Sequence, residues 1–92
     1  MELSSRYPRR HPEVVTQPSG ELLLLLHLAD GQYYTLSEVG QRVWELADGT
    51  RSVAAIVATL CTEYEASAAT IEADVVELLE DLTRAQLLAP PA

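Results

Sequence analysis

Three short stretches of apolar and β-favouring residues lie between residues 13 and 36, and turn-forming residues separate them. The separators are Pro18-Ser19-Gly20 and Asp30-Gly31, which are typical of tight turns between strands. The leucine-rich run between them favours a short strand over a helix because of its length, although leucine itself slightly favours helix. The pattern predicts a three-stranded antiparallel meander, with strands at Glu13–Gln17, Leu22–Leu28 and Gln32–Leu36.

The middle strand is apolar on both faces. Because side chains alternate along a strand, the even-numbered leucines from Leu22 to Leu28 share one face, and Leu23, Leu25 and His27 share the other. We expect one face to pack on helices and the other to be partly covered. His27 has no Cys, His or carboxylate at a useful spacing, so we interpret it as a structural or surface histidine.

The chain after Leu36 changes to helical periodicity, with a capping residue before each apolar series. The pattern predicts one helix over Ser37–Asp48 that ends at Gly49, a second starting after Ser52, and a third from Ser67 or Thr70 to about Ala85. Gly40 is expected to make room for a close neighbour. The predicted fold class is α+β, a three-stranded antiparallel sheet followed by three helices, as in a winged helix-turn-helix. The predicted core consists of Leu36, Val43, Leu46, Ile56, Leu60, Ile71, Val75, Leu78 and Leu82.

Charge and length restrict the possible partners. From residue 11 onward, three arginines stand against thirteen Asp and Glu residues, a net charge of −10, which disfavours nucleic acid and anionic membranes. The longest apolar run, Leu22–Leu26, is too short to span a membrane, and no secretory signal follows the N-terminal arginines. We therefore expect a cytoplasmic protein, organised as a flexible N-terminal arm (1–12), one domain (13–89) and a tail (90–92).

We find no set of residues suited to catalysis. The chain lacks a glycine-rich phosphate loop, and neither its single Cys61 nor its two histidines have the spacing of a nucleophile–base pair or a metal site. The carboxylates fall at solvent-facing helical positions. The sequence therefore predicts a protein that is not an enzyme and that needs no metal and no cofactor.

The third strand is the candidate binding element. It has no neighbouring strand after it in the predicted meander, so its outer edge carries unpaired backbone groups. It contains no Pro, Lys or other charge between Gln32 and Leu36, the devices that usually protect an edge. We therefore expect the edge to bind an extended peptide by strand addition.

The order of motifs along the chain resembles the PqqD-like family, the recognition elements that bind leader peptides of ribosomally made, modified peptides. The resemblance covers about Val14 to Leu88, and the chain departs from it at Ala85-Gln86, where relatives often have Gly. It is most similar to the standalone leader-binding subunit of a split lasso-peptide maturation protease. The motifs are Gly31-x-Tyr33-Tyr34-x-Leu36, Gly40-x-x-Val43-Trp44-x-Leu46, Asp48-Gly49, Val53-x-x-Ile56-Val57-x-x-Leu60 and Asp74-Val75-x-x-Leu78-Leu79-x-x-Leu82.

The resemblance implies that a precursor leader peptide adds to the third strand, lies against the third helix, and is presented to a separate cysteine protease. It also implies an ATP-dependent cyclase acting afterwards. Carried over to this chain, the backbone partners are Gln32, Tyr33, Tyr34 and Thr35. Helix residues Val76, Leu79 and Thr83 would form the other wall and Val75 its floor. Glu72 and Glu80 would receive basic leader residues. In the free protein we expect a weak homodimer through the same edge.

Two other functions remain open from the sequence. A winged-helix transcription regulator shares the predicted fold, although its recognition helix needs basic residues that this chain lacks. A protein–protein adaptor or dimerisation module needs no leader peptide at all.

Overall fold

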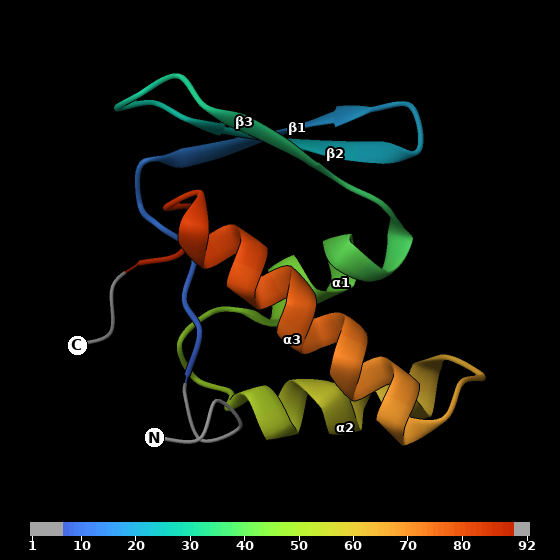
Figure 1. Ribbon diagram of the computed structural model, residues 1–92. Helices are drawn as coiled ribbons and strands as arrows, with labels where there is room; N and C mark the ends of the chain where they lie inside the picture. Colours follow the sequence, from blue (N-terminus) through green and yellow to red (C-terminus); the bar gives the residue numbers. More distant parts are fainter. Residues whose placement is uncertain (1–6, 90–92) are drawn as a thin grey trace.

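The computed structural model describes residues 7–89 and contains three strands followed by three helices. The strands pair in the order β1-β2-β3, with both pairs antiparallel (Figure 1). The predicted α+β fold class and the meander are therefore confirmed. The elements are β1 (Val14–Ser19), β2 (Leu22–His27), β3 (Tyr33–Leu36), α1 (Glu38–Leu46), α2 (Val53–Glu63) and α3 (Ala68–Arg84).

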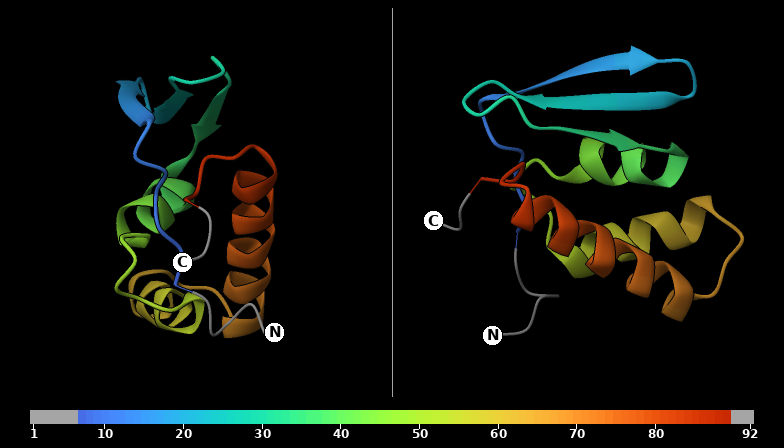
Figure 2. Two further views of the ribbon diagram at one scale, coloured as in Figure 1. Left: turned by 90° about the vertical axis from the view of Figure 1, so that its left-hand side faces the viewer. Right: turned by 45° about the horizontal axis from the view of Figure 1, so that its top comes forward.

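The helices all lie on one side of the sheet (Figures 1 and 2). The side chains of Leu25, His27 and Leu36 are buried on that inner face. The opposite, outer face carries Leu22 and Leu28, which are 42% and 61% exposed. We expected this face to be partly covered, but no helix of residues 7–89 covers it.

Two of the three predicted helix caps and most of the core follow the predicted pattern. Ser37 stands at the N-cap position of α1, but its side chain makes no capping hydrogen bond. The Ser52 hydroxyl accepts a hydrogen bond from the Ala55 N–H (3.1 Å), and the Ser67 hydroxyl accepts one from the Thr70 N–H (3.2 Å). Eight of the nine predicted core residues are buried, and Leu78 is the exception because it is only half-buried. Leu79 is 3% exposed, so the buried stripe of α3 is centred closer to Leu79 than predicted, and Leu78 lies at its margin.

α1 approaches the end of β3 closely. A Cβ atom at Gly40 would lie 3.2 Å from Leu36 Cδ2, which is tighter than an ordinary van der Waals contact, so a side chain there would require Leu36 or the helix to shift. Gly40 therefore makes room for a close neighbour, as predicted. The Gln41 amide donates to the Glu21 carbonyl (2.8 Å) and to the Leu36 carbonyl (3.3 Å). These contacts fix the position of β3 relative to the helices.

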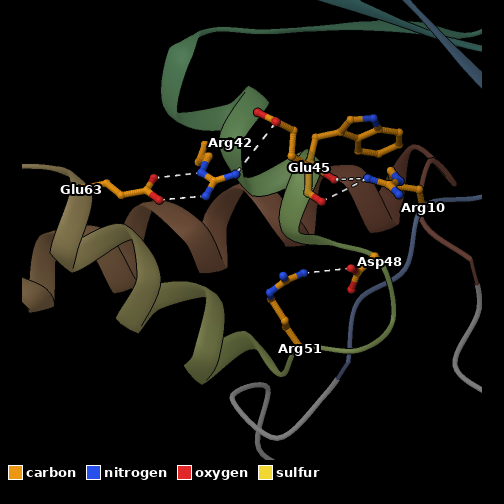
Figure 3. Close-up of polar contacts among 7 residues, drawn as sticks. Arg10, Arg42, Glu45, Asp48, Arg51 and Glu63 are labelled. Carbon is orange, nitrogen blue, oxygen red and sulfur yellow. Dashed lines mark hydrogen bonds and ion pairs between the residues drawn. The ribbon is translucent and has the colours of Figure 1, made fainter.

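α1 ends at Leu46, two residues earlier than predicted. The cause is Asp48, whose carboxylate accepts from the Thr50 hydroxyl (2.6 Å) and the Thr50 N–H (2.9 Å) and so favours a turn over another helical turn. These hydrogen bonds, led by the Thr50 hydroxyl, lower the pKa of Asp48 to about 2. Arg51 adds an ion pair of 2.8 Å (Figure 3).

Arginines join segments that are distant in the sequence (Figure 3). Arg42 of α1 donates to both carboxylate oxygens of Glu63 at the end of α2, at 2.9 and 2.8 Å. This pairing lowers the pKa of the Glu63 carboxyl. The Arg10 guanidinium donates to the carbonyls of Trp44 (3.0 Å) and Glu45 (3.2 Å) at the end of α1, where the Trp44 carbonyl also accepts from the Ala47 N–H (3.3 Å).

Residues 8–11 differ from the flexible arm that we expected for residues 1–12. The Arg10 N–H donates to the Ala47 carbonyl (3.1 Å), and the Gly49 N–H donates to the Pro8 carbonyl (3.0 Å). The Ala89 N–H donates to the Arg9 carbonyl (2.7 Å) on the other side. The segment is held because it supplies partners for backbone groups beyond the end of α1. Residues 1–6 of the expected arm, and the tail 90–92, lie outside the described residues.

α3 ends in a left-handed residue at the position where the chain departs from the family pattern. Gln86 has φ +59°, a conformation that glycine adopts without steric conflict. The Leu87 N–H then donates back to the Leu82 carbonyl (2.9 Å), and the Leu87 side chain is 1% exposed. The turn thus keeps the geometry expected of glycine and returns the chain to the core.

Candidate functional site

β3 presents two residues whose backbone groups face away from the sheet. The His27 N–H donates to the Gln32 carbonyl (2.9 Å), which marks a hydrogen-bonded pair in the β2–β3 register. In an antiparallel ladder such pairs alternate with non-bonded ones. Tyr34 therefore pairs toward β2, whereas Tyr33 and Thr35 direct N–H and C=O groups to the open edge.

This geometry divides the four predicted backbone partners into two kinds. Tyr33 and Thr35 face the edge, and Tyr33 is 72% exposed. Gln32 and Tyr34 do not, because their carbonyls and amides belong to the β2 side of the ladder or to the turn, where the Gln32 N–H donates to the Asp30 carboxylate (3.0 Å). The sequence located the strand, but only the register determines which of its residues face the edge.

The side chain of Tyr34 lies close to one flank of α3. Burial, and then the Asp81 and Glu77 carboxylates, raise the pKa of the Tyr34 phenol, and Arg84 opposes this effect. Leu78 lies on the same side of the helix, since its Cδ2 is 3.6 Å from the Cβ position of Gly40. We name the α3 residues Glu77, Leu78 and Asp81 the strand-side flank. Figure 2 (left) shows α3 and β3 on the same side of the molecule, with β1 farther away.

The predicted helix residues do not lie on this flank. Val75 and Leu79 are 1% and 3% exposed and belong to the core, and their contact with a leader peptide stays a prediction. At 100° per residue, Glu72, Val76 and Thr83 lie about 140–180° around the axis from Asp81, and Glu80 about 100°. The predicted helix residues thus lie around the axis from Asp81 and Glu77, whose carboxylates act on the Tyr34 phenol of β3.

The strand-side flank is acidic. Asp81 forms an ion pair with Arg84 on the same helix. Glu77 is exposed and has no ion-pair partner among residues 7–89, and the same holds for Asp74 one turn earlier. A peptide added to β3 would therefore lie close to negative charge.

Other candidate chemistry is limited in the described part of the chain. His27 is buried, and its Nδ1 accepts from the Ala29 N–H (3.2 Å), which fits the structural role predicted for it. No group of three or more His, Cys, Asp or Glu within residues 7–89 is arranged to hold a metal ion. None of the helices in that range has the length and apolar character needed to cross a membrane.

Comparison with known proteins identifies the family. The family model for coenzyme PQQ synthesis protein D (PqqD) matches residues 23–88. The chain belongs to the PqqD family. A protein named PqqA binding protein from Xanthomonas oryzae pv. oryzae (strain PXO99A) is 44% identical over 61 residues, which cover 66% of each chain. One from Rhodopseudomonas palustris (strain HaA2) is 42% identical over 55 residues, covering 60% of this chain and 54% of that protein. The matched segment thus spans just under two thirds of the PqqD relative from Xanthomonas.

Two solved structures share the PqqD fold over most of the chain. TbiB1 in complex with the TbiA(beta) leader peptide superposes with a TM-score of 0.79 at 32% identity, covering 91% of this chain and 98% of that one. Lasso peptide synthetase B1 complexed with the leader peptide gives a TM-score of 0.80 at 23% identity, covering 91% and 99%. The likeness to TbiB1 extends beyond the fold, because nearly a third of the aligned residues are identical.

Proposed function

We propose that this chain recognises the leader segment of a ribosomally made precursor peptide and binds it by adding it as a strand to β3. The observation that carries the proposal is the pair of outward-facing residues, Tyr33 and Thr35, on an edge without charge or proline. PqqD-family relatives named for binding PqqA, and the leader complex of TbiB1, support it.

The binding mode follows from backbone geometry. The leader runs antiparallel to β3 and exchanges hydrogen bonds with Tyr33 and Thr35, which fixes its register regardless of its side chains. Alternate leader side chains then face the strand-side flank. Because Glu77 and Asp81 are negative, leader residues at these positions are basic. Glu72 and Glu80, to which the resemblance assigns this role, lie farther around the helix.

The protein performs no chemistry in this proposal. It presents the bound precursor to a separate leader peptidase of the cysteine protease class, and an ATP-dependent cyclase acts on the released peptide. All three proteins work in the cytoplasm. In the absence of leader, two copies pair weakly through the β3 edges, and the leader dissociates them because it occupies the same backbone groups. Nucleic acid is not a partner, since the chain beyond residue 10 is strongly acidic.

Paired charge reversals on the two flanks of α3 test the site. The variant Glu77→Lys/Asp81→Lys should weaken binding of a labelled leader by about tenfold or more, because it repels basic leader residues and blocks the wall beside β3. The control Glu72→Lys/Glu80→Lys makes the same change in net charge on the rest of the helix surface and should bind leader as the parent does. Fluorescence anisotropy measures both affinities.

Folding and sequence specificity need their own controls. Thermal melts establish that both variants are folded, and a scrambled leader of the same composition separates recognition from simple charge attraction. Equal weakening by the two variants would place the peptide elsewhere or reduce binding to a general electrostatic effect. A parent that binds no precursor leader would refute the function itself.

A further inference from the structure

The outer face of the sheet is an apolar surface that the leader site does not use. On this face the strand registers place Val15 of β1 opposite Leu26 of β2, and Leu26 opposite Tyr33 of β3. The three side chains form a row across the sheet. Val15, Leu28 and Tyr33 are 44%, 61% and 72% exposed. We name this set the outer patch; its members are Val15, Leu22, Leu24, Leu26, Leu28 and Tyr33.

Four members of the outer patch are exposed, and Leu24 and Leu26 between them are half-buried. An apolar patch of this kind spanning three strands is unusual for a surface that stays in water. No helix among residues 7–89 lies over it (Figure 2). Single exposed leucines need no explanation, but here every residue that β2 directs to this face is a leucine. The patch therefore has the composition of an interface core.

The charge around the patch indicates what covers it. Strand alternation assigns one charged residue to this face, Glu13, which pairs with Leu28 at the end of the register, where the Leu28 N–H donates to its carbonyl (2.9 Å). The chain as a whole carries −8. Two copies stacked through this face would bring like charges together, whereas a surface with Lys or Arg around an apolar centre would be attracted.

The patch is also continuous with the proposed leader site. Tyr33 and Thr35 contribute their backbones to the edge and their side chains to the outer face. A strand added at this edge directs every second side chain to the same face and so enlarges the patch by one strand. A protein that docks here contacts both the sheet and the bound leader.

We propose that the outer patch docks a partner protein with an apolar surface ringed by basic residues, and that this partner is the leader peptidase. This inference rests on the proposed function and adds the surface through which the two proteins meet. Docking through the sheet face leaves the β3 edge and α3 open for the leader. It also positions the leader beside the peptidase.

The test uses a purified leader peptidase of the cysteine protease class from the same organism, immobilised for surface plasmon resonance. The variant Val15→Lys/Leu28→Lys places two charges in the patch at exposed positions and should weaken peptidase binding by about tenfold or more. The control Val39→Lys/Ala54→Lys makes the same charge change at exposed positions on α1 and α2 and should bind as the parent does. Leader affinity, measured by anisotropy, should be unchanged in both variants.

The outcomes separate the two proposals. Peptidase binding that survives the patch variant, or a parent that binds no peptidase, overturns the docking surface while leader binding still supports the proposed function. Failure of the parent to bind leader overturns the proposed function. A sedimenting dimer of the chain alone that the patch variant abolishes would assign the face to a second copy and overturn the assignment to the peptidase.

Discussion

The two edges of the sheet have the same backbone chemistry but differ in how many backbone N–H groups are free to pair with another strand. On β1, the Leu28–Glu13 hydrogen bond sets the alternation, so Val14, Thr16 and Pro18 are the residues that face outward. The Val14 N–H already donates to the His11 carbonyl (3.1 Å), and Pro18 has no N–H. Only Thr16 offers a donor there, whereas β3 offers two, on Tyr33 and Thr35.

This difference shows how one sheet can have one closed and one open edge. A proline at a non-bonded position leaves the β1–β2 ladder intact while it removes a donor from the exposed side, which is a usual protection of edge strands. β3 has no such protection and lies beside an acidic helix flank. Because the open edge lies next to an acidic helix flank, it is suited to bind a strand that carries basic side chains.

The largest expected effect comes from closing the open edge. Thr35→Pro removes an outward N–H without removing a bond to β2, and should weaken leader binding by about a hundredfold or abolish it. Thr16→Pro makes the same change on β1 and should leave leader affinity as in the parent. Anisotropy titrations of folded variants decide, and equal losses from the two would remove the distinction between the edges.

A smaller effect is expected at alkaline pH, because of the two edge strands only β3 carries tyrosines, Tyr33 and Tyr34. The pKa of Tyr34 is raised above its unfolded value of 10.0 by burial and by Asp81 and Glu77. The neutral phenol therefore stabilises the fold fully below pH 10, and this contribution is lost as pH rises through the folded pKa. Melting temperatures of the parent should fall by a few degrees more than those of Tyr34→Phe between about pH 9 and 11. Parallel curves for the two proteins would contradict this role of Tyr34.

The smallest effect is expected from opening the closed edge. Pro18→Val restores an outward N–H on β1 next to that of Thr16, so the variant should show weak additional self-association, with a dissociation constant of about 1 mM. Sedimentation equilibrium at several concentrations, with saturating leader to occupy β3, isolates association through β1. A variant that remains as monomeric as the parent would show that Pro18 does not protect this edge.

Local signals in the sequence predicted most of the fold. Ser52 and Ser67 mark helix starts because their hydroxyls satisfy backbone N–H groups, and such capping depends only on nearby residues. The role of Gly40 was predictable from local sequence too, because a glycine within a predicted helix indicates that a neighbour approaches closely.

The sequence could not determine relations between elements that are distant in it. A helical wheel gives the flanks of α3 but not which flank faces β3, so Val76 and Thr83 were placed beside a strand that passes next to Asp81. Leu79 was assigned to the groove for the same reason, although it is 3% exposed. Strand propensity likewise located β3 but could not distinguish Tyr33 from Tyr34, because only the register with β2 does so.

The bridges of Arg9 to Asp48 and of Arg10 to Leu88 have a consequence for local unfolding. Residues 8–11 lie between the end of α1 and residues 87–89, so loss of this segment removes partners from both neighbours at once. The hydrogen bonds donated by the amides of Arg10, Gly49 and Ala89 form only while residues 8–11 are in place. In hydrogen exchange these three amides should open together as one cooperative unit, although they are dispersed along the chain, and exchange separately from the amides within α2 and α3.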